Sequence, residues 1–156
     1  MIGLLAKVAR TEEGARALGS RSSARLEWSR VTAQVAAHCL NGRAAEMVRS
    51  RLPFTDPESI SLQHALADEI RADGDRDVWP PLTDVGPALD LIRQPPPVRL
   101  EGPDLVHLAA VAEASDRLRD FFLAARERFP VWGEAAVELA VFSGLSGGIR
   151  RALDRD

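Results

Sequence analysis

The chain has a single cysteine, a single lysine and no long apolar run. One cysteine, Cys39, excludes an internal disulfide and fits a reducing compartment. No apolar stretch approaches the roughly 18 residues that a membrane helix needs. The apolar run at residues 1–7 is too short for a signal peptide and is soon broken by charge. We therefore expect a cytoplasmic protein that does not enter a membrane.

An excess of basic charge is also lacking. The 20 basic residues, of which only Lys7 is a lysine, are outweighed by acidic ones, and the net charge is -3. The chain as a whole therefore gives no sign of nucleic-acid binding, and any contact with DNA must be local. A length of 156 residues, 46% hydrophobic and 28% charged, is typical of one globular domain with a real core.

Period-two alternation is almost absent, whereas apolar residues recur at helical spacing. The sequence predicts an all-α fold, a multi-helix bundle with one long central helix. Residues 1–25 are expected to form a short amphipathic helix or arm, and residues 26–156 the helical domain. The apolar positions of the arm are Leu4, Leu5, Val8, Ala15 and Leu18.

The first helix of the domain is expected over residues 26–40, with Asn41-Gly42 as its C-cap. The next is expected over residues 44–52 and stops at Pro53. The apolar stripe of the first helix consists of Val31, Val35 and Cys39. We expect this stripe to be buried, with Cys39 acting as a small hydrophobic residue.

Thr55-Asp56-Pro57-Glu58 is the best local helix signal. Thr55 can cap the free N–H groups, Glu58 can complete a capping box, and Pro57 fits the first turn. The helix that it opens is expected to end near Gly74. Two proline runs, at residues 79–81 and 95–97, then bracket a short helix over 85–92.

The longest helix is expected to start near Pro103 and to run to Phe129, with Pro130 ending or kinking it. A helix pair split by Ser143-Gly144 follows. Residues at heptad spacing along the long helix indicate a seam that packs on partner helices. The expected core comprises Leu108, Val111, Leu118, Phe122 and Phe129 of this helix, with Leu62, Leu66, Val31 and Val35.

The order of these breaks resembles a known family. The segments are Leu26-Glu27-Trp28-Ser29, Asn41-Gly42, Leu52-Pro53 with Thr55-Asp56, Pro81-Leu82 with Asp84-Val85, the long helix, and Leu153-Asp154-Arg155-Asp156. Together they resemble the N-terminal helical core of a MutS-type DNA mismatch repair ATPase. The match is closest to the branch that lacks the mismatch-reading domain and carries a C-terminal Smr nuclease domain.

The resemblance implies a mechanical role in DNA repair or recombination. In such a protein this region is a helical scaffold that connects the DNA clamp and levers to the ATPase and supports dimeric packing. ATP and Mg²⁺ belong to the parent family, and the resemblance implies no cofactor in this chain. The implied partners are the remaining MutS-like domains or a second copy of the chain.

Each catalytic motif that the sequence suggests lacks either a required residue or the structural context in which that motif works. The phosphate-binding loop Gly-x-x-x-x-Gly-Lys-Ser/Thr is missing around Lys7, so we expect no ATP hydrolysis and no enzyme activity. Residues 144–148 fit Gly-x-Ser-x-Gly, but that motif works on a strand-to-helix turn, and we expect glycine caps at a helix end instead. His38 and Cys39 are neighbours on a helix and do not face each other. No metal-ligand spacing occurs.

Two groups of arginines are the candidates for a weak contact with the DNA backbone. The first comprises Arg30, Arg43, Arg49 and Arg51, and the second Arg150, Arg151 and Arg155. Pairing with nearby acids on helix surfaces is the favoured alternative, given the net negative charge. The tryptophans are expected to be core anchors. A small stand-alone helical protein–protein interaction module remains the alternative function.

Overall fold

A computed structural model describes residues 26–51, 53, 56–73, 82–96 and 99–154. Within these residues all regular structure is helical, which confirms the predicted all-α class. The helices are α4 (Trp28–Ala36), α5 (Gly42–Arg49), α6 (Pro57–Asp73), α7 (Gly86–Arg93), α8 (Gly102–Ala124), α9 (Pro130–Val137) and α10 (Ser143–Leu153). The expected arm at residues 1–25, Thr55, Trp79 and Arg155 lie outside the described part.

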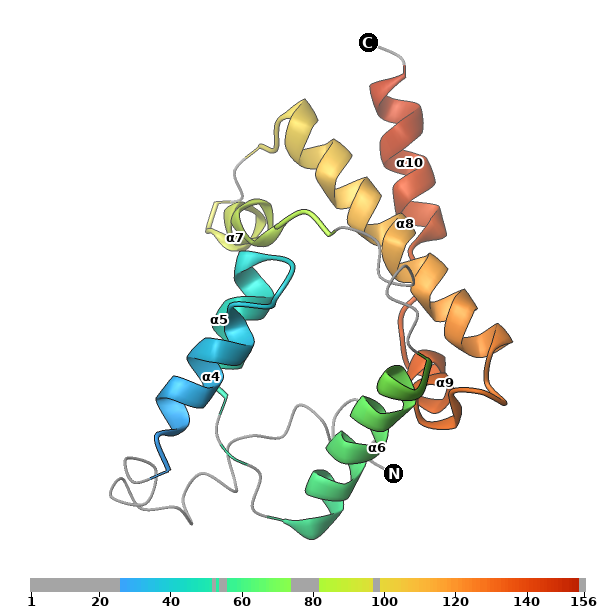
Figure 1. Cartoon of the computed structure of the whole chain (residues 1–156). Helices are drawn as coiled ribbons and strands as arrows, with labels where there is room; N and C mark the ends of the chain where they lie inside the picture. The colour runs from blue at the N-terminus through green and yellow to red at the C-terminus, as the bar shows by residue number, and fades with distance from the viewer. Residues whose placement is uncertain (1–25, 52, 54–55, 74–81, 97–98, 155–156) are drawn as a thin grey trace.

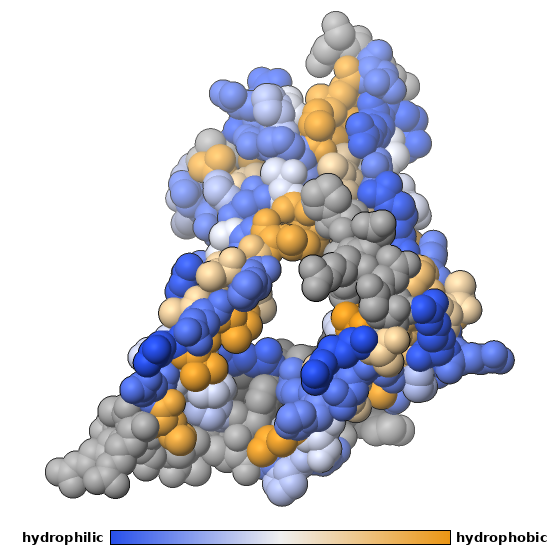
Figure 2. All heavy atoms as spheres, viewed as in Figure 1, coloured by the Kyte–Doolittle hydropathy of each residue, from blue (hydrophilic) through white to orange (hydrophobic). Residues whose placement is uncertain are grey.

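The long helix α8 is the centre of the packing, as predicted. At 1.5 Å per residue it is about 35 Å long. Helices α9 and α10 both pack on α8, and α6 packs on α9. Figure 1 shows α4 and α5 as a separate pair, opposite α6 and α8, with α7 above the pair. The space-filling view in Figure 2 shows an opening between the two parts.

Aromatic side chains hold the core where α8 meets α9. Phe122 and Phe129 are buried, their ring centroids are 5.6 Å apart, and the two rings are perpendicular. The Trp132 ring stacks on Phe122 at 5.1 Å. The Trp132 indole N–H donates to the Leu66 carbonyl oxygen at 2.9 Å and so attaches α6 to this cluster. Burial of Phe122, Phe129 and Leu66 confirms part of the predicted core.

The remaining core is built from small residues. Ala109, Ala112 and Ala114 are buried along α8, and such residues let helix backbones approach closely. Leu62, Leu108, Val111 and Leu118, predicted to lie in the core, are only half-buried.

The prediction of a buried stripe on α4 was wrong. Val31 and Val35 are exposed, while Thr32 and Ala36 are the residues that α4 buries. Cys39 is half-buried, and its thiol donates to the Val35 carbonyl oxygen at 3.9 Å. The small side chains at the buried positions allow α4 and α5 to pack as a close hairpin.

Several helix ends also differ from the prediction. Asn41 does not cap the end of the first helix: its side chain accepts from the Ala44 N–H at 2.8 Å and caps the start of α5. At the start of α6 the capping side chain is Asp56, whose carboxylate accepts from the Ser59 N–H at 2.7 Å. The long helix ends at Ala124, and Pro130 begins α9.

The glycines expected to cap a helix end lie inside a helix. Gly144, Gly147 and Gly148 all belong to α10. This helix begins at Ser143, and its first residues are held by a neighbour: the Asp116 carboxylate of α8 accepts from the Phe142 N–H at 2.8 Å. A contact with another helix thus supports the start of α10 despite its glycines.

Candidate functional site

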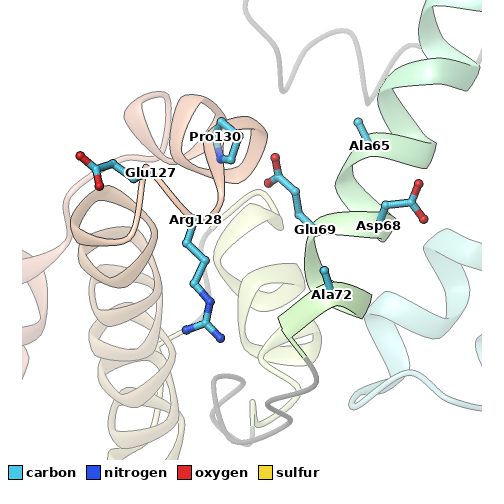
Figure 3. A pocket seen from close by; sticks show the side chains of 7 residues that line it. All are labelled: Ala65, Asp68, Glu69, Ala72, Glu127, Arg128 and Pro130. Atoms are coloured by element: carbon cyan, nitrogen blue, oxygen red, sulfur yellow. The ribbon is translucent and has the colours of Figure 1, made fainter.

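An open cleft with a volume of about 570 Å³ lies between α6 and the start of α9. The residues lining it are Ala65, Asp68, Glu69, Ala72, Glu127, Arg128 and Pro130. Figure 3 shows the Glu69 side chain reaching from α6 toward Pro130, whereas Asp68 and Glu127 point away from the space between the helices. The three carboxylates therefore do not converge on one point.

Glu69 is occupied by a structural task in this cleft. Its two carboxylate oxygens accept from the backbone N–H groups of Val131 and Trp132, at 2.8 and 3.1 Å. These are the first free donors of α9, because Pro130 has none. Asp68 lies 3.7 Å from Arg71 on the surface, and the Arg128 guanidinium lies over the Phe129 ring. At this cleft Glu69 therefore holds α6 against the start of α9.

The other residues that could suggest catalysis are not grouped. Ser146 lies inside α10, not on a strand-to-helix turn, and its hydroxyl donates to the Ser143 carbonyl oxygen at 3.3 Å. His38 is exposed at the end of α4. Among the described residues, no three His, Cys, Asp or Glu side chains are placed to hold a metal ion.

Of the first arginine group, two members have acidic partners on their own helix or its cap. Arg30 pairs with Glu27 at 2.9 Å, and Arg43 lies 3.9 Å from Glu46. Arg51 follows α5 and is half-buried, and loss of solvent lowers the pKa of its guanidinium. Its carbonyl oxygen accepts from the Trp28 indole N–H at 2.7 Å, which anchors Trp28 at the base of the hairpin. The first arginine group thus lies on the α4–α5 hairpin, but two of its members are in ion pairs and Arg51 is half-buried.

Arg49 and Arg151 differ from Arg30, Arg43 and Arg150, because neither has a carboxylate within ion-pair distance among the residues that the structure describes. Arg150, next to Arg151 on α10, forms two hydrogen bonds with Glu113 of α8, at 2.9 and 3.0 Å. This pairing raises the pKa of Arg150 and lowers that of Glu113. Of these arginines, Arg49 and Arg151 are therefore the candidates for a contact with a phosphate group.

A surface that the sequence analysis missed lies on the α4–α5 hairpin. Five large apolar side chains are exposed there, namely Leu26, Val31, Val35, Leu40 and Met47. We call these five residues the hairpin face. Figure 2 shows apolar residues along this hairpin, on the side that borders the opening. The sequence did contain a pattern from which this surface could have been predicted. Val31 and Val35 form one pair at helical spacing on α4, and Thr32 and Ala36 form another. Only one of the two pairs can face α5, so the other is left exposed.

Comparison with known proteins gives no assignment: no family model, no curated protein and no solved structure matches this chain. Within the described residues, no helix is both long and apolar enough to cross a membrane.

Proposed function

We propose that this chain is a non-catalytic helical scaffold whose α4–α5 hairpin receives partner helices. The hairpin face carries the proposal. Exposed apolar residues that are scattered singly are normal, but five large ones on one short helical hairpin make that hairpin a candidate interaction surface. The remainder of the described structure supplies a firm support, since α6, α8, α9 and α10 are joined by cross-helix hydrogen bonds and an aromatic cluster.

The parent that we propose is a MutS-type DNA repair ATPase that acts in the cytoplasm, with this chain as part of its helical core. The support is the order of helix breaks in the sequence, together with the long helix that centres the packing. In that setting the partner helices come from the lever region, and the chain connects the DNA clamp to the ATPase. ATP, Mg²⁺ and nuclease chemistry then belong to other parts of the parent protein.

Reading the gene beyond the codon for Asp156 tests the parent assignment. We expect a lever-like helix pattern and then a Gly-x-x-x-x-Gly-Lys-Ser/Thr loop. The encoded helical segment, expressed separately, should co-elute with the wild-type chain and not with Val35→Arg. If translation stops without such a segment, the MutS-type assignment is wrong, and a stand-alone helical interaction module is the better description.

A contact with DNA phosphates is a second, weaker role that we propose for the arginines. Arg49 and Arg151 support it, because no described carboxylate neutralises them. The net charge of -3 limits this contact to these patches.

A further inference from the structure

The described helices form two sets that pack within themselves. Helix α4 packs on α5, while α9 and α10 pack on α8 and α6 packs on α9. We call α6, α8, α9 and α10 the four-helix body. The aromatic cluster around Phe122 and Phe129 joins this body, and among the described residues none of the cluster's side chains comes from the α4–α5 hairpin. Figure 1 shows the hairpin apart from α6 and α8, with α7 next to the start of α5.

The carboxylate of Asp84 lies between the hairpin and α7. Its Oδ1 atom accepts from the N–H of Gly86, the first residue of α7, at 2.9 Å. Its Oδ2 atom lies against Gly42, the first residue of α5, where a Cβ would be only 2.7 Å away. The first turn of a helix has free N–H groups and the positive end of the helix dipole. A negative charge is therefore well placed between these two helix starts.

Both helices begin with a glycine, and the position of the Asp84 carboxylate requires both. A Cβ at Gly86 would lie 2.9 Å from Oδ1, as close as the one at Gly42 would be to Oδ2. Either side chain would force the carboxylate to turn away, and its hydrogen bond to Gly86 would be lost. The aliphatic part of Arg43 also reaches this point, since its Cδ atom lies 3.9 Å from the Cβ position of Gly86. We call Gly42, Asp84 and Gly86 the joint.

We propose that the α4–α5 hairpin opens away from α7 at this joint, while the four-helix body stays folded. Asp84 is exposed, so its carboxylate can leave the two helix starts for water without becoming a buried, unpaired charge. Local opening of a unit costs less free energy than global unfolding when few contacts are lost. The joint is a conformational device of this chain alone, and it does not depend on which partner the hairpin binds.

Hydrogen exchange of the full chain, followed amide by amide, tests the joint. Helices of 9 and 8 residues are marginal by themselves, so a hairpin released from α7 should exchange faster. In Asp84→Ala the amides of α4, α5 and α7 should exchange about fivefold faster than in the wild type, the usual size of a lost helix cap. Those of α8, α9 and α10 should keep their wild-type rates. Asp90→Ala is the matched control, because Asp90 lies on α7 and has only a surface contact with Arg93.

A substitution on the other side of the joint makes the test sharper. In the wild-type background Gly42→Ala displaces the Asp84 carboxylate, so it should accelerate exchange of the same amides. In the Asp84→Ala background no carboxylate is left to displace. There Gly42→Ala should leave the rates unchanged or slow them, because alanine favours a helix more than glycine does. The two substitutions are thus expected to be strongly non-additive, as residues in contact are.

Three results would overturn the inference. The first is exchange in Asp84→Ala that matches Asp90→Ala, which would mean that the carboxylate does not hold the hairpin. The second is an equal loss of protection in α8, α9 and α10, which would mean that the hairpin does not open separately from the four-helix body. The third is an effect of Gly42→Ala that is the same with and without the Asp84 carboxylate, because the two residues would then not meet.

Discussion

Glu69 of α6 accepts a hydrogen bond from the backbone N–H of Trp132, 63 residues further along the chain, over 3.1 Å. A second bond, from the Val131 N–H, reaches the other carboxylate oxygen. Trp132 in turn donates its indole N–H to the Leu66 carbonyl oxygen, one turn before Glu69. The start of α9 is thus capped by a different helix. Since α9 also packs on α8, this cap connects α6 to the central helix.

Glu69→Ala tests this cap. The substitution removes the acceptor of two helix-terminal N–H groups, so it should lower the free energy of unfolding by about 1–2 kcal/mol. Asp68→Ala is the matched control, because Asp68 is exposed and its pairing with Arg71 is a surface contact. Urea unfolding measures both, and the m value should not change. Equal midpoints for the two variants would show that α9 does not depend on Glu69.

The parts of the fold that could be predicted are those that depend on local sequence. Pro57, Pro103 and the spacing along α8 indicate where helices lie, and large aromatics such as Phe122 and Phe129 indicate the core. The Glu69–Trp132 contact could not be predicted, because it joins positions far apart in sequence through tertiary packing. For α4 the prediction failed because larger apolar residues were assumed to face inward, whereas close hairpin packing selects Thr32 and Ala36.

Two glycine substitutions should change stability in opposite directions. Gly148 lies in the interior of α10, where an added Cβ meets nothing within 4 Å. Gly148→Ala should therefore stabilise the protein by about 0.5–1 kcal/mol through helix propensity. At Gly133 of α9, the Cβ would lie 3.2 Å from the Phe122 carbonyl oxygen and 2.7 Å from Arg126 Cγ.

Gly133→Ala should destabilise the protein by about 1 kcal/mol, because the backbone of α8 cannot easily give way. Thermal unfolding followed by circular dichroism compares the two variants with the wild type. A stabilising Gly133→Ala would mean that α9 packs on α8 more loosely than the structure indicates.

The ion pair between Glu113 and Arg150 predicts a pH dependence. Hydrogen bonding to Arg150 is the main cause that lowers the pKa of Glu113 below its ordinary value of 4.5. A carboxyl group with a depressed pKa stabilises the fold above its ordinary pKa, and that contribution is lost as the pH falls through the lowered value. The difference in Tm between wild type and Glu113→Gln should therefore be present at neutral pH and vanish in acid.

Carbon NMR of the Glu113 carboxyl group measures its pKa directly, so the effect of Arg150 on that pKa can be tested. In Arg150→Ala the pKa of Glu113 should rise toward its ordinary value. Arg117 is the control, because its charge is the smallest of the contributions to Glu113, and Arg117→Ala should shift that pKa less. If both variants shift the pKa equally, the summed positive charge near Glu113 and not its hydrogen bonds with Arg150 sets that pKa.

The candidate sites show a similar limit of sequence reasoning. Arginines are easy to find in a sequence, but whether each is paired depends on the acids that the fold brings near it. Glu46 is within one helical turn of Arg43, so that pairing could be foreseen. Glu113 and Arg150 are 37 residues apart and meet because α10 packs on α8. The hairpin face was missed because it depends on which side of α4 meets α5.

Changing Arg43, Arg49 and Arg51 together to alanine tests the proposed contact with DNA. Each phosphate contact contributes about 0.9 to the slope of log K against log salt, so the triple variant should flatten that slope by up to roughly 3. Arg49→Ala by itself should account for much of the change, because Arg43 lies near Glu46 and Arg51 is half-buried. Arg71→Ala, on the acidic helix α6, is the control and should leave the slope unchanged. Fluorescence anisotropy with duplex and branched DNA over a salt titration gives the slopes. An unchanged slope in the triple variant would mean that the arginines of the α4–α5 hairpin serve only its surface, and that any DNA contact belongs to Arg151 and its neighbours.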